Sequence, residues 1–206
     1  MSSRITELIS KSTTIPAGRY SPPMPDTRDR ILNAAEARLL SEGPGGLVLE
    51  AIAAEAAISK GGLLYHFASK EALVAGLCER MLQGFDERLE TLTEADDRGP
   101  GAFTRAYLAT TVTAEGKPAD NSARLMAGIL ATLGRDSTHM VQLREAFARW
   151  HARLAADGID ETTATLVRLA ADGLWLSALL GLNELDPTAG REALAALHEL
   201  TCTEDA

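Results

Sequence analysis

Aromatic residues, cysteines and long apolar runs are scarce or missing in this chain of 206 residues. Only 4% of the residues are aromatic although 46% are hydrophobic, so alanine and leucine supply most of the apolar surface, which favours helices over strands. The two cysteines, Cys78 and Cys202, lie far apart and indicate neither a disulfide framework nor a redox motif. Because no run of about 18 apolar residues and no signal-peptide pattern occurs, we expect a cytoplasmic protein that makes no membrane contact.

Sequence motifs of enzymes are also missing. The chain has no phosphate-binding glycine loop, no Gly-x-Ser-x-Gly element and no pair of histidines at metal-ligand spacing. The neighbours Tyr65 and His66 could act as acid and base only within a cleft, which a short exposed helix rarely provides. The sequence therefore predicts no enzyme, no cofactor and no metal site.

Charge is unevenly distributed along the chain. The net charge is -9, but residues 1–70 carry eight Lys or Arg against seven Asp or Glu, whereas residues 71–206 carry twelve against twenty-two. DNA would repel the acidic C-terminal part. Any contact with nucleic acid must therefore lie in the N-terminal part.

The N-terminal part contains the pattern of a helix-turn-helix. Residues 1–25 are rich in Ser, Thr and Pro and are predicted to form a mobile tail, which could alternatively reach along a DNA backbone. A first helix is expected from Thr27, as its cap residue, to about Ser41, and a second from about Leu49 to Ala56. Only two residues separate the second helix from the next helix start at Ser59, which is typical of a helix-turn-helix.

The segment from Ser59 to Leu73 carries the main functional signal. Ser59 can cap a helix, and Gly61 and Gly62 leave its first turn without bulky side chains, so backbone amides can approach phosphates or base edges. Each glycine costs the helix about 1 kcal/mol relative to alanine, which indicates that access matters there. Four side chains could attract or bond phosphate oxygens: Lys60, Tyr65, His66 and Lys70. A short helix with a flexible start and a polar face is the alternative interpretation.

Residues 27–75 resemble the head of TetR-type transcriptional regulators. The resemblance rests on Ile31-Leu-Asn-Ala-Ala35, Gly43, Ile52-Ala53, Ile58-Ser-Lys-Gly61, Leu64-Tyr-His-Phe67 and Ser69-Lys-Glu-Ala-Leu73. It implies an all-α homodimer with a three-helix DNA-binding head at residues 26–72 and a helical ligand-binding and dimerisation body at residues 73–206. By position, it places Lys60, Gly61 and Gly62 at base edges, Tyr65, His66 and Lys70 on phosphates, and Thr27 near the DNA backbone.

Three residues of the head depart from the pattern of these regulators. Val48 stands where a Thr or Ser usually caps the second helix and contacts a phosphate, and Leu64 replaces a frequent aromatic residue. Ala57 occupies a turn position that usually holds glycine, which strains the turn if it needs a positive φ. We therefore expect light phosphate anchoring, with DNA shape sharing the recognition.

The body is predicted to be helical throughout. Helices are expected at about Ser69–Leu92, 101–114, 119–134, 137–156, 160–182 and 188–202. The last two carry wide apolar faces, and the resemblance implies that they pair with their copies in the homodimer. An intramolecular hairpin would produce the same pattern.

A small-molecule site is expected in the body. Eight residues are candidates for its wall: Phe103, Tyr107, Arg124, Met126, Phe147, Trp150, His151 and Trp175. Core packing is the alternative role for the apolar ones, and surface salt bridges for Arg124 and His151. The few aromatic residues favour a small or apolar ligand.

Together, the residues and the resemblance predict a ligand-responsive transcriptional repressor. A homodimer would bind a double-stranded DNA operator with partly palindromic half-sites, and a small-molecule effector of unknown identity would release it. A head that binds another protein instead is the alternative. Salt distinguishes the two, because DNA binding weakens steeply as salt rises.

Overall fold

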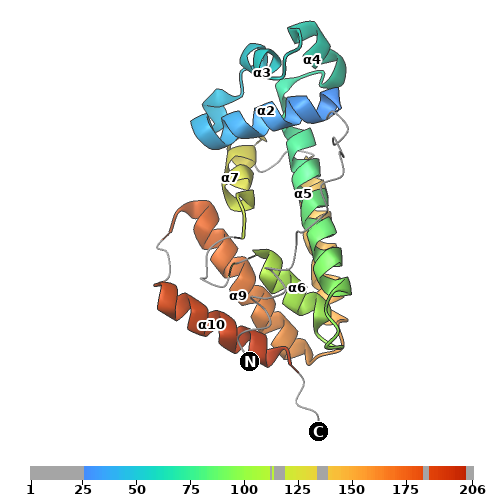
Figure 1. The fold of residues 1–206 in the computed structure, drawn as a ribbon, viewed down its shortest axis with the longest axis vertical. Helices are drawn as coiled ribbons and strands as arrows, with labels where there is room; N and C mark the ends of the chain where they lie inside the picture. The colour runs from blue at the N-terminus through green and yellow to red at the C-terminus, as the bar shows by residue number, and fades with distance from the viewer. Residues whose placement is uncertain (1–25, 112, 114–118, 134–138, 183–185, 203–206) are drawn as a thin grey trace, which may run out of the picture.

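The computed structural model describes residues 26–111, 113, 119–133, 139–182 and 186–202, and every regular element in these ranges is helical. A small head lies above an elongated helical body (Figure 1). The elements are α2 (Thr27–Glu42), the 3-10 helix η1 (Gly43–Gly46), α3 (Leu49–Glu55), α4 (Lys60–His66), α5 (Lys70–Glu94), α6 (Ala102–Thr111), α7 (Ser122–Leu133), α8 (His139–Ala155), α9 (Glu161–Leu180) and α10 (Pro187–Leu200). The predicted all-α class with a helix-turn-helix head is thus confirmed, while the tail predicted at residues 1–25 lies outside the described residues.

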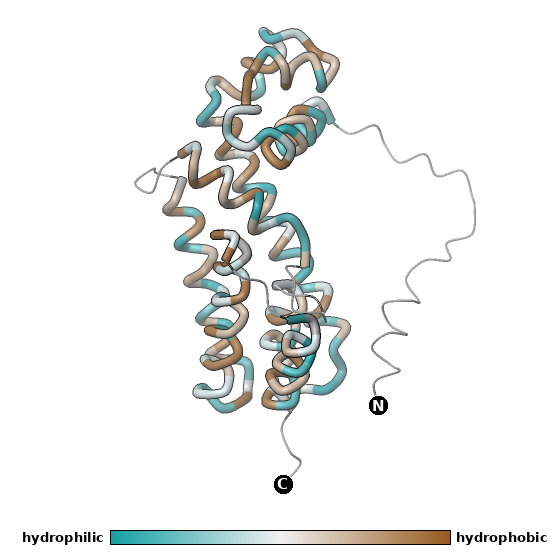
Figure 2. The backbone as a smooth tube through the Cα atoms, turned by 90° about the vertical axis from the view of Figure 1, so that its left-hand side faces the viewer, coloured by the Kyte–Doolittle hydropathy of each residue, from teal (hydrophilic) through white to brown (hydrophobic). Residues whose placement is uncertain are grey.

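The head is held together by a small apolar core. Ile31 and Leu32 of α2, Ile52 of α3 and Leu63 of α4 are fully buried. Burying a side chain of this size stabilises a fold by roughly 1.5–3 kcal/mol. Hydrophobic and hydrophilic positions alternate along these helices (Figure 2), so each helix turns its polar side to the solvent.

Helix α5 joins the head to the body. The Ser69 hydroxyl caps it by accepting a hydrogen bond from the Ala72 amide at 3.1 Å. Gly76 lies against the head, where an added Cβ would stand 2.7 Å from Cε1 of Phe67, so this contact requires glycine. With 25 residues, α5 extends about 37 Å, which makes it a continuous rod from the head along the body.

Two buried polar clusters fix the base of the body. Arg105, whose side chain is 3% exposed, bonds Asp96 at 2.7 Å and the Thr201 carbonyl at 2.8 Å. Burial opposes the charge of Asp96, but hydrogen bonds from Arg98 and Arg105 outweigh it and lower the Asp96 pKa. Arg105 thereby ties the start of α6 to the segment after α5 through the ion pair, and to the end of α10 through the Thr201 carbonyl.

Asp157 provides the second of these clusters. Its carboxylate accepts hydrogen bonds from the Thr104 amide at 2.7 Å and from the Phe103 amide at 3.1 Å, both in the first turn of α6. Charged acceptors suit a helix N-terminus because they satisfy free amides and the helix dipole.

One predicted helix start is wrong. Asp26, not Thr27, is the N-cap of α2: its backbone is non-helical and its carbonyl already accepts the Arg30 amide at 2.9 Å. Thr27 is the first helical residue. The other predicted helices are present, with ends displaced by a few residues. No helix in the described ranges has both the length and the apolar character needed to span a lipid bilayer.

Candidate DNA interface and ligand cavity

Helix α4 lies at the outer end of the head, away from the body (Figure 1). The Ser59 hydroxyl accepts the Gly62 amide at 3.0 Å, as predicted for a cap residue. Among the described residues, only Ser59 Oγ comes near a Cβ added at Gly61, at 3.9 Å, and none comes closer than 3.4 Å to one at Gly62. Internal packing therefore does not require these glycines, and an external partner would explain them.

Two aromatic rings follow the glycines on α4. Tyr65 is 87% exposed, and its ring meets the His66 ring edge to face with 5.4 Å between centroids. The Tyr65 hydroxyl and ring are therefore accessible to a partner that approaches this end of the head. Leu64, which stands in place of an aromatic residue frequent in TetR-type heads, is also exposed.

The turn before α4 carries backbone strain. Ala57 adopts a φ of 55°, in the left-handed region that favours glycine. The sequence predicted this strain for a turn that requires a positive φ, and the structure confirms it. Val48 stands at the N-cap of α3 and provides no side-chain cap, also as predicted.

Most basic side chains of the head already have partners within the protein. Lys60 Nζ lies 2.5 Å from Glu50 Oε1 of α3, and this hydrogen bond is the main cause of a lowered Glu50 pKa. Lys70 donates to the Pro44 carbonyl at 3.3 Å. Arg28 pairs with Glu79 at 3.0 Å, next to the partly buried Thr27. The cationic groups that DNA would need are thus shared with carboxylates and carbonyls.

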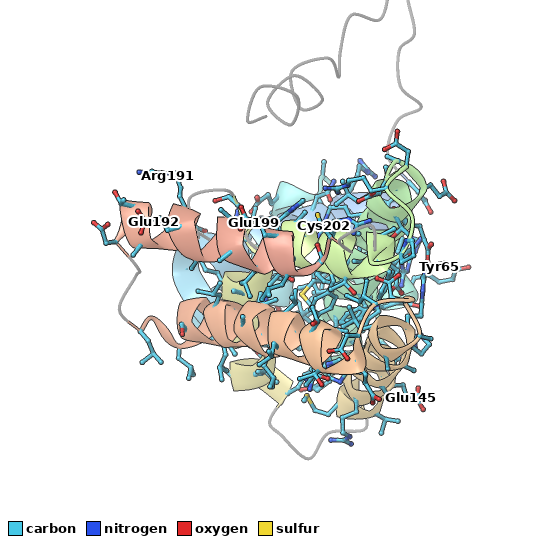
Figure 3. All side chains as sticks on the ribbon, turned by 90° about the horizontal axis from the view of Figure 1, so that it is seen from below. Tyr65, Glu145, Arg191, Glu192, Glu199 and Cys202 are labelled. Atoms are coloured by element: carbon cyan, nitrogen blue, oxygen red, sulfur yellow. The ribbon has the colours of Figure 1, made fainter. Side chains whose placement is uncertain are left out.

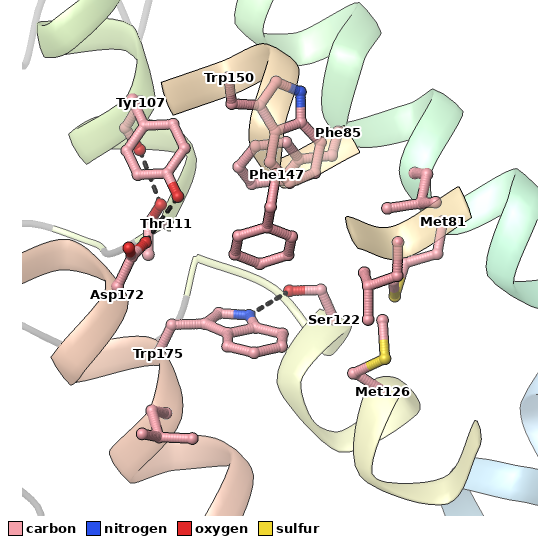
Figure 4. A pocket seen from close by; sticks show the side chains of 13 residues that line it. Met81, Phe85, Tyr107, Thr111, Ser122, Met126, Phe147, Trp150, Asp172 and Trp175 are labelled. Carbon is pink, nitrogen blue, oxygen red and sulfur yellow. Dashed lines mark hydrogen bonds between the residues drawn. The ribbon is translucent and has the colours of Figure 1, made fainter. Parts of the chain in front are cut away.

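The body contains a partly open cavity of about 240 Å³ between α5, α6, α7, α8 and α9 (Figure 4). Aromatic and methionine side chains dominate its wall. The lining residues are Met81, Leu82, Phe85, Tyr107, Thr111, Ser122, Met126, Leu143, Phe147, Trp150, Asp172, Trp175 and Leu176. This composition is typical of sites for small organic ligands.

Hydrogen bonds orient the polar edges of three of these rings. Tyr107 donates to Asp172 Oδ1 at 2.6 Å, Trp175 to the Ser122 hydroxyl at 3.3 Å, and Trp150 to Asp86 outside the cavity at 2.5 Å. Burial, and then the charge of Asp172, strongly raise the Tyr107 pKa, so its hydroxyl remains protonated. The rings therefore form a wall with fixed orientation.

Five of the eight candidate ligand residues lie on this wall: Tyr107, Met126, Phe147, Trp150 and Trp175. The structure does not bring the other three there. The Phe103 ring is buried and covered by the Arg153 guanidinium at 4.0 Å. Arg124 reaches the head instead, and His151 lies behind Asp172, with 3.6 Å between Nε2 and Oδ2.

Sequence reasoning missed Asp172 and Phe85. Asp172 is the only acidic residue of α9 after its first turn, in an otherwise apolar stretch, which was a usable signal. Phe85, on α5, was not among the eight candidate ligand residues. Its ring packs 4.5 Å from the Trp150 ring between centroids.

Helix α7 contacts both the cavity and the head. Ser122 and Met126 line the cavity, while Arg124 donates to the Leu40 carbonyl of α2 at 2.9 Å. Gly128 packs against Leu39 so closely that an added Cβ would lie 2.6 Å from Cδ1. A displacement of α7 by a ligand would therefore act directly on α2.

An apolar stripe on α9 faces the solvent. It comprises Leu166, Leu169, Gly173, Leu176 and Leu180, spaced three and four residues apart, with the leucines between 49% and 61% exposed. Helix α10 runs alongside α9 (Figure 3) but makes no extensive contact with another described helix. The structure thus leaves much of both C-terminal helices uncovered.

Both the N-terminal and the C-terminal part of the chain match models of known protein families. Residues 31–77 match the family model described as bacterial regulatory proteins, tetR family, and residues 101–202 match the model of a tetracyclin repressor-like C-terminal domain. The HTH-type transcriptional regulator UidR of Escherichia coli strain K12 is 40% identical over 74 residues, which are 34% of this chain. The match spans only 38% of the length of UidR.

Solved structures are similar over most of the chain. The multidrug binding protein EbrR, complexed with ethidium, is 28% identical with a TM-score of 0.57, over 84% of this chain and 98% of EbrR. A transcriptional regulator from Rhodococcus sp. Rha1 is 23% identical with a TM-score of 0.64, over 84% of this chain and 95% of its own.

Proposed function

Because this chain belongs to the TetR family of transcriptional regulators, we propose that it is a DNA-binding repressor that a small-molecule effector releases from its operator. The observation that carries the proposal is α4: a capped helix start with two glycines that internal packing does not require, at the outer end of the head. Its first turn, which carries the two glycines, would lie against base edges, and Lys60 would provide the polar side chain that contacts the bases. Tyr65, His66 and Lys70 would bond phosphates on either side.

DNA must compete for these groups. Lys60 would leave Glu50, and Lys70 would leave the Pro44 carbonyl or share it. The head therefore gains less from each phosphate than a head with free cations would. Thr27, at the start of α2, adds a hydroxyl near the DNA backbone, where Val48 offers none.

A homodimer compensates for weak single heads, because two heads on one duplex combine their binding energies. The stripe on α9 suits a second copy of the same helix: its three-and-four spacing is that of a helix-packing seam, and Gly173 allows close approach. Helix α10, poorly covered within one chain, would complete a four-helix interface. Replacing Leu169 by Glu would bury a charge in this seam and should convert the dimer to monomers in analytical ultracentrifugation.

The cavity is the proposed effector site. EbrR, which has 28% identity to this chain, is described as a multidrug binding protein in complex with ethidium, which supports an organic ligand here. A ligand between Trp175, Met126 and Phe147 would press on α7, and α7 would move α2 through the Arg124 and Gly128 contacts. The two heads would then lose the spacing that fits successive major grooves.

The proposal is tested by binding of the purified protein to DNA upstream of its own gene across a salt series. Affinity should fall steeply with salt. Lys60→Ala should raise the Kd about tenfold and relax the base preference, whereas Lys70→Ala should weaken binding to all sequences alike. The exposed Arg144, on α8, provides the charge-matched control, and Arg144→Ala should bind like wild type.

Flat salt dependence would contradict DNA binding and favour a head that binds another protein. Equal behaviour of the Lys60, Lys70 and Arg144 variants would show that the assigned surface is wrong even if DNA binds elsewhere.

A further inference from the structure

The chemistry of the cavity wall narrows the class of ligand, provided that this cavity is the effector site of the proposed function. Aromatic rings from four helices face it: Phe85, Tyr107, Phe147, Trp150 and Trp175. Figure 4 shows Phe147 between Trp150 and Trp175. The face of an aromatic ring carries partial negative charge and attracts cations, tryptophan most strongly.

Asp172 supplies a full negative charge at the same wall. Among the described residues it is the only charged side chain that lines the cavity. Its Oδ1 accepts the Tyr107 hydroxyl at 2.6 Å, which fixes the carboxylate, while Oδ2 accepts a long hydrogen bond from Arg168 at 3.4 Å. A fixed carboxylate with remaining acceptor capacity suits a positively charged group.

The two basic residues beside Asp172, Arg168 and His151, lie outside the lining of the cavity. Arg168 lies one turn earlier on α9, and its Nη1 forms a long ion pair with Oδ2 at 3.4 Å, which leaves carboxylate lone pairs for a ligand. Burial, and then the charge of Arg168, lower the His151 pKa, so that this ring is neutral near neutral pH. His151 Nε2, buried and without a hydrogen-bond partner among the described residues, stands 3.6 Å from Oδ2, which is too far for a hydrogen bond.

We propose that the cavity binds a small organic cation, with its positive charge at Asp172 and its apolar groups against the rings. A cavity of about 150 Å³ holds benzene, so 240 Å³ corresponds to a ligand of roughly ten non-hydrogen atoms. An anion of the same size would meet both the carboxylate and the negative ring faces and should bind more weakly than the cation.

The test compares two ligands of the same shape, phenyltrimethylammonium and tert-butylbenzene, which differ by a cationic nitrogen in place of a carbon. The chain has only two tryptophans, and both line the cavity, so intrinsic fluorescence reports binding directly. The full-length wild-type protein should bind the cation more tightly than the neutral compound. Asp172→Asn keeps the shape and an acceptor for Tyr107, and it should lower this preference on the order of 10–100-fold. Glu161→Gln, at an exposed site on the same helix, removes the same charge and should leave the preference unchanged.

The proposal is overturned if the wild type binds neither compound, if it binds the neutral compound at least as tightly, or if Asp172→Asn retains the preference. The comparison of the two compounds on the wild type shows whether the cavity prefers a cation even if the Asp172 variant does not fold. DNA binding is measured separately, without ligand, so the two proposals can fail independently. A protein that does not bind DNA can still prefer the cation, and a protein that binds DNA can still lack this preference.

Discussion

The polar groups of the head form their pairs at the solvent-exposed surface, whereas those of the body form them in buried positions. In the head, Lys60 and Glu50 pair at the surface with both side chains more than half exposed, and Tyr65 is 87% exposed. In the body, the side chains of Arg105 and Asp96 are buried, and Asp172 faces a partly open aromatic cavity. Exposed pairs contribute little to stability and exchange partners readily, whereas a buried charge that loses its partner is costly.

The difference suits two tasks. A surface that binds DNA must offer its donors to phosphates, so its internal pairs have to be weak enough to open. A body that binds a ligand and transmits its presence must keep the wall and the helix contacts fixed. Substitutions in the body should therefore alter folding or ligand response, and those on the face of the head should alter DNA affinity with little loss of stability.

The largest effect is expected for Asp96→Ala at the base of the body. It leaves the Arg105 guanidinium, 3% exposed, without its carboxylate, which should cost about 3–5 kcal/mol in the free energy of unfolding by urea. The neighbouring Asp97 is exposed, so Asp97→Ala should change stability by less than about 0.5 kcal/mol. Equal effects of the two variants would contradict a buried ion pair.

The same pair predicts a pH dependence. The Asp96 pKa is lower in the folded protein than in the unfolded chain, so its contribution to stability is complete above the ordinary Asp pKa of about 3.9. It is lost as the pH falls further, toward the lowered pKa. Melting temperatures of the wild type should therefore approach those of the Asp96→Ala variant between about pH 4 and pH 2.

Gly128→Ala should disturb the contact between the two regions. The added Cβ would lie 2.6 Å from Cδ1 and 2.8 Å from Cγ of Leu39, so α7 and α2 must separate or Leu39 must rearrange, at about 1–3 kcal/mol. Gly84 offers a matched helical glycine, since the nearest atom to its added Cβ, in Arg88, is 3.6 Å away. Gly84→Ala should be neutral or stabilising in the same thermal melts. A ligand response that survives Gly128→Ala unchanged would argue against coupling through α7.

The two regions also differ in how far the sequence predicts them. The segment from Ser59 to Leu73 is contiguous, so the cap, the glycines and the exposed side chains of α4 follow from local pattern. The cavity joins residues from five helices, and sequence spacing does not reveal which faces meet. Arg124 illustrates the limit: its charge suggested a ligand contact, but the packing of α7 on α2 directs it to Leu40.

A gain of stability is expected from Ala57→Gly in the turn before α4. Glycine adopts the observed φ of 55° without the Cβ clash, so the variant should be more stable by about 1 kcal/mol. Ala54, exposed within α3, provides the opposite control, because glycine in a helix interior should destabilise by about 1 kcal/mol. Stability gained without loss of DNA affinity would mean that the strain serves no part of recognition. A drop in affinity would mean that alanine sets the approach angle of α4.

The smallest effect is expected for Glu50→Gln, which removes the ion-pair partner of Lys60. Glu50→Gln removes a carboxylate that lies 2.5 Å from Lys60 Nζ and lets the ammonium move to the DNA without losing an ion pair. It also removes a negative charge beside the proposed interface, so affinity should rise about threefold at low salt, and the gain should shrink as salt screens it. Glu55→Gln, also exposed on α3, shares the charge change but not the contact with Lys60, and it should produce a smaller gain. If Glu50→Gln instead lowers affinity and relaxes the base preference, Glu50 orients Lys60 for reading, and the ion pair belongs to the recognition surface rather than competing with it.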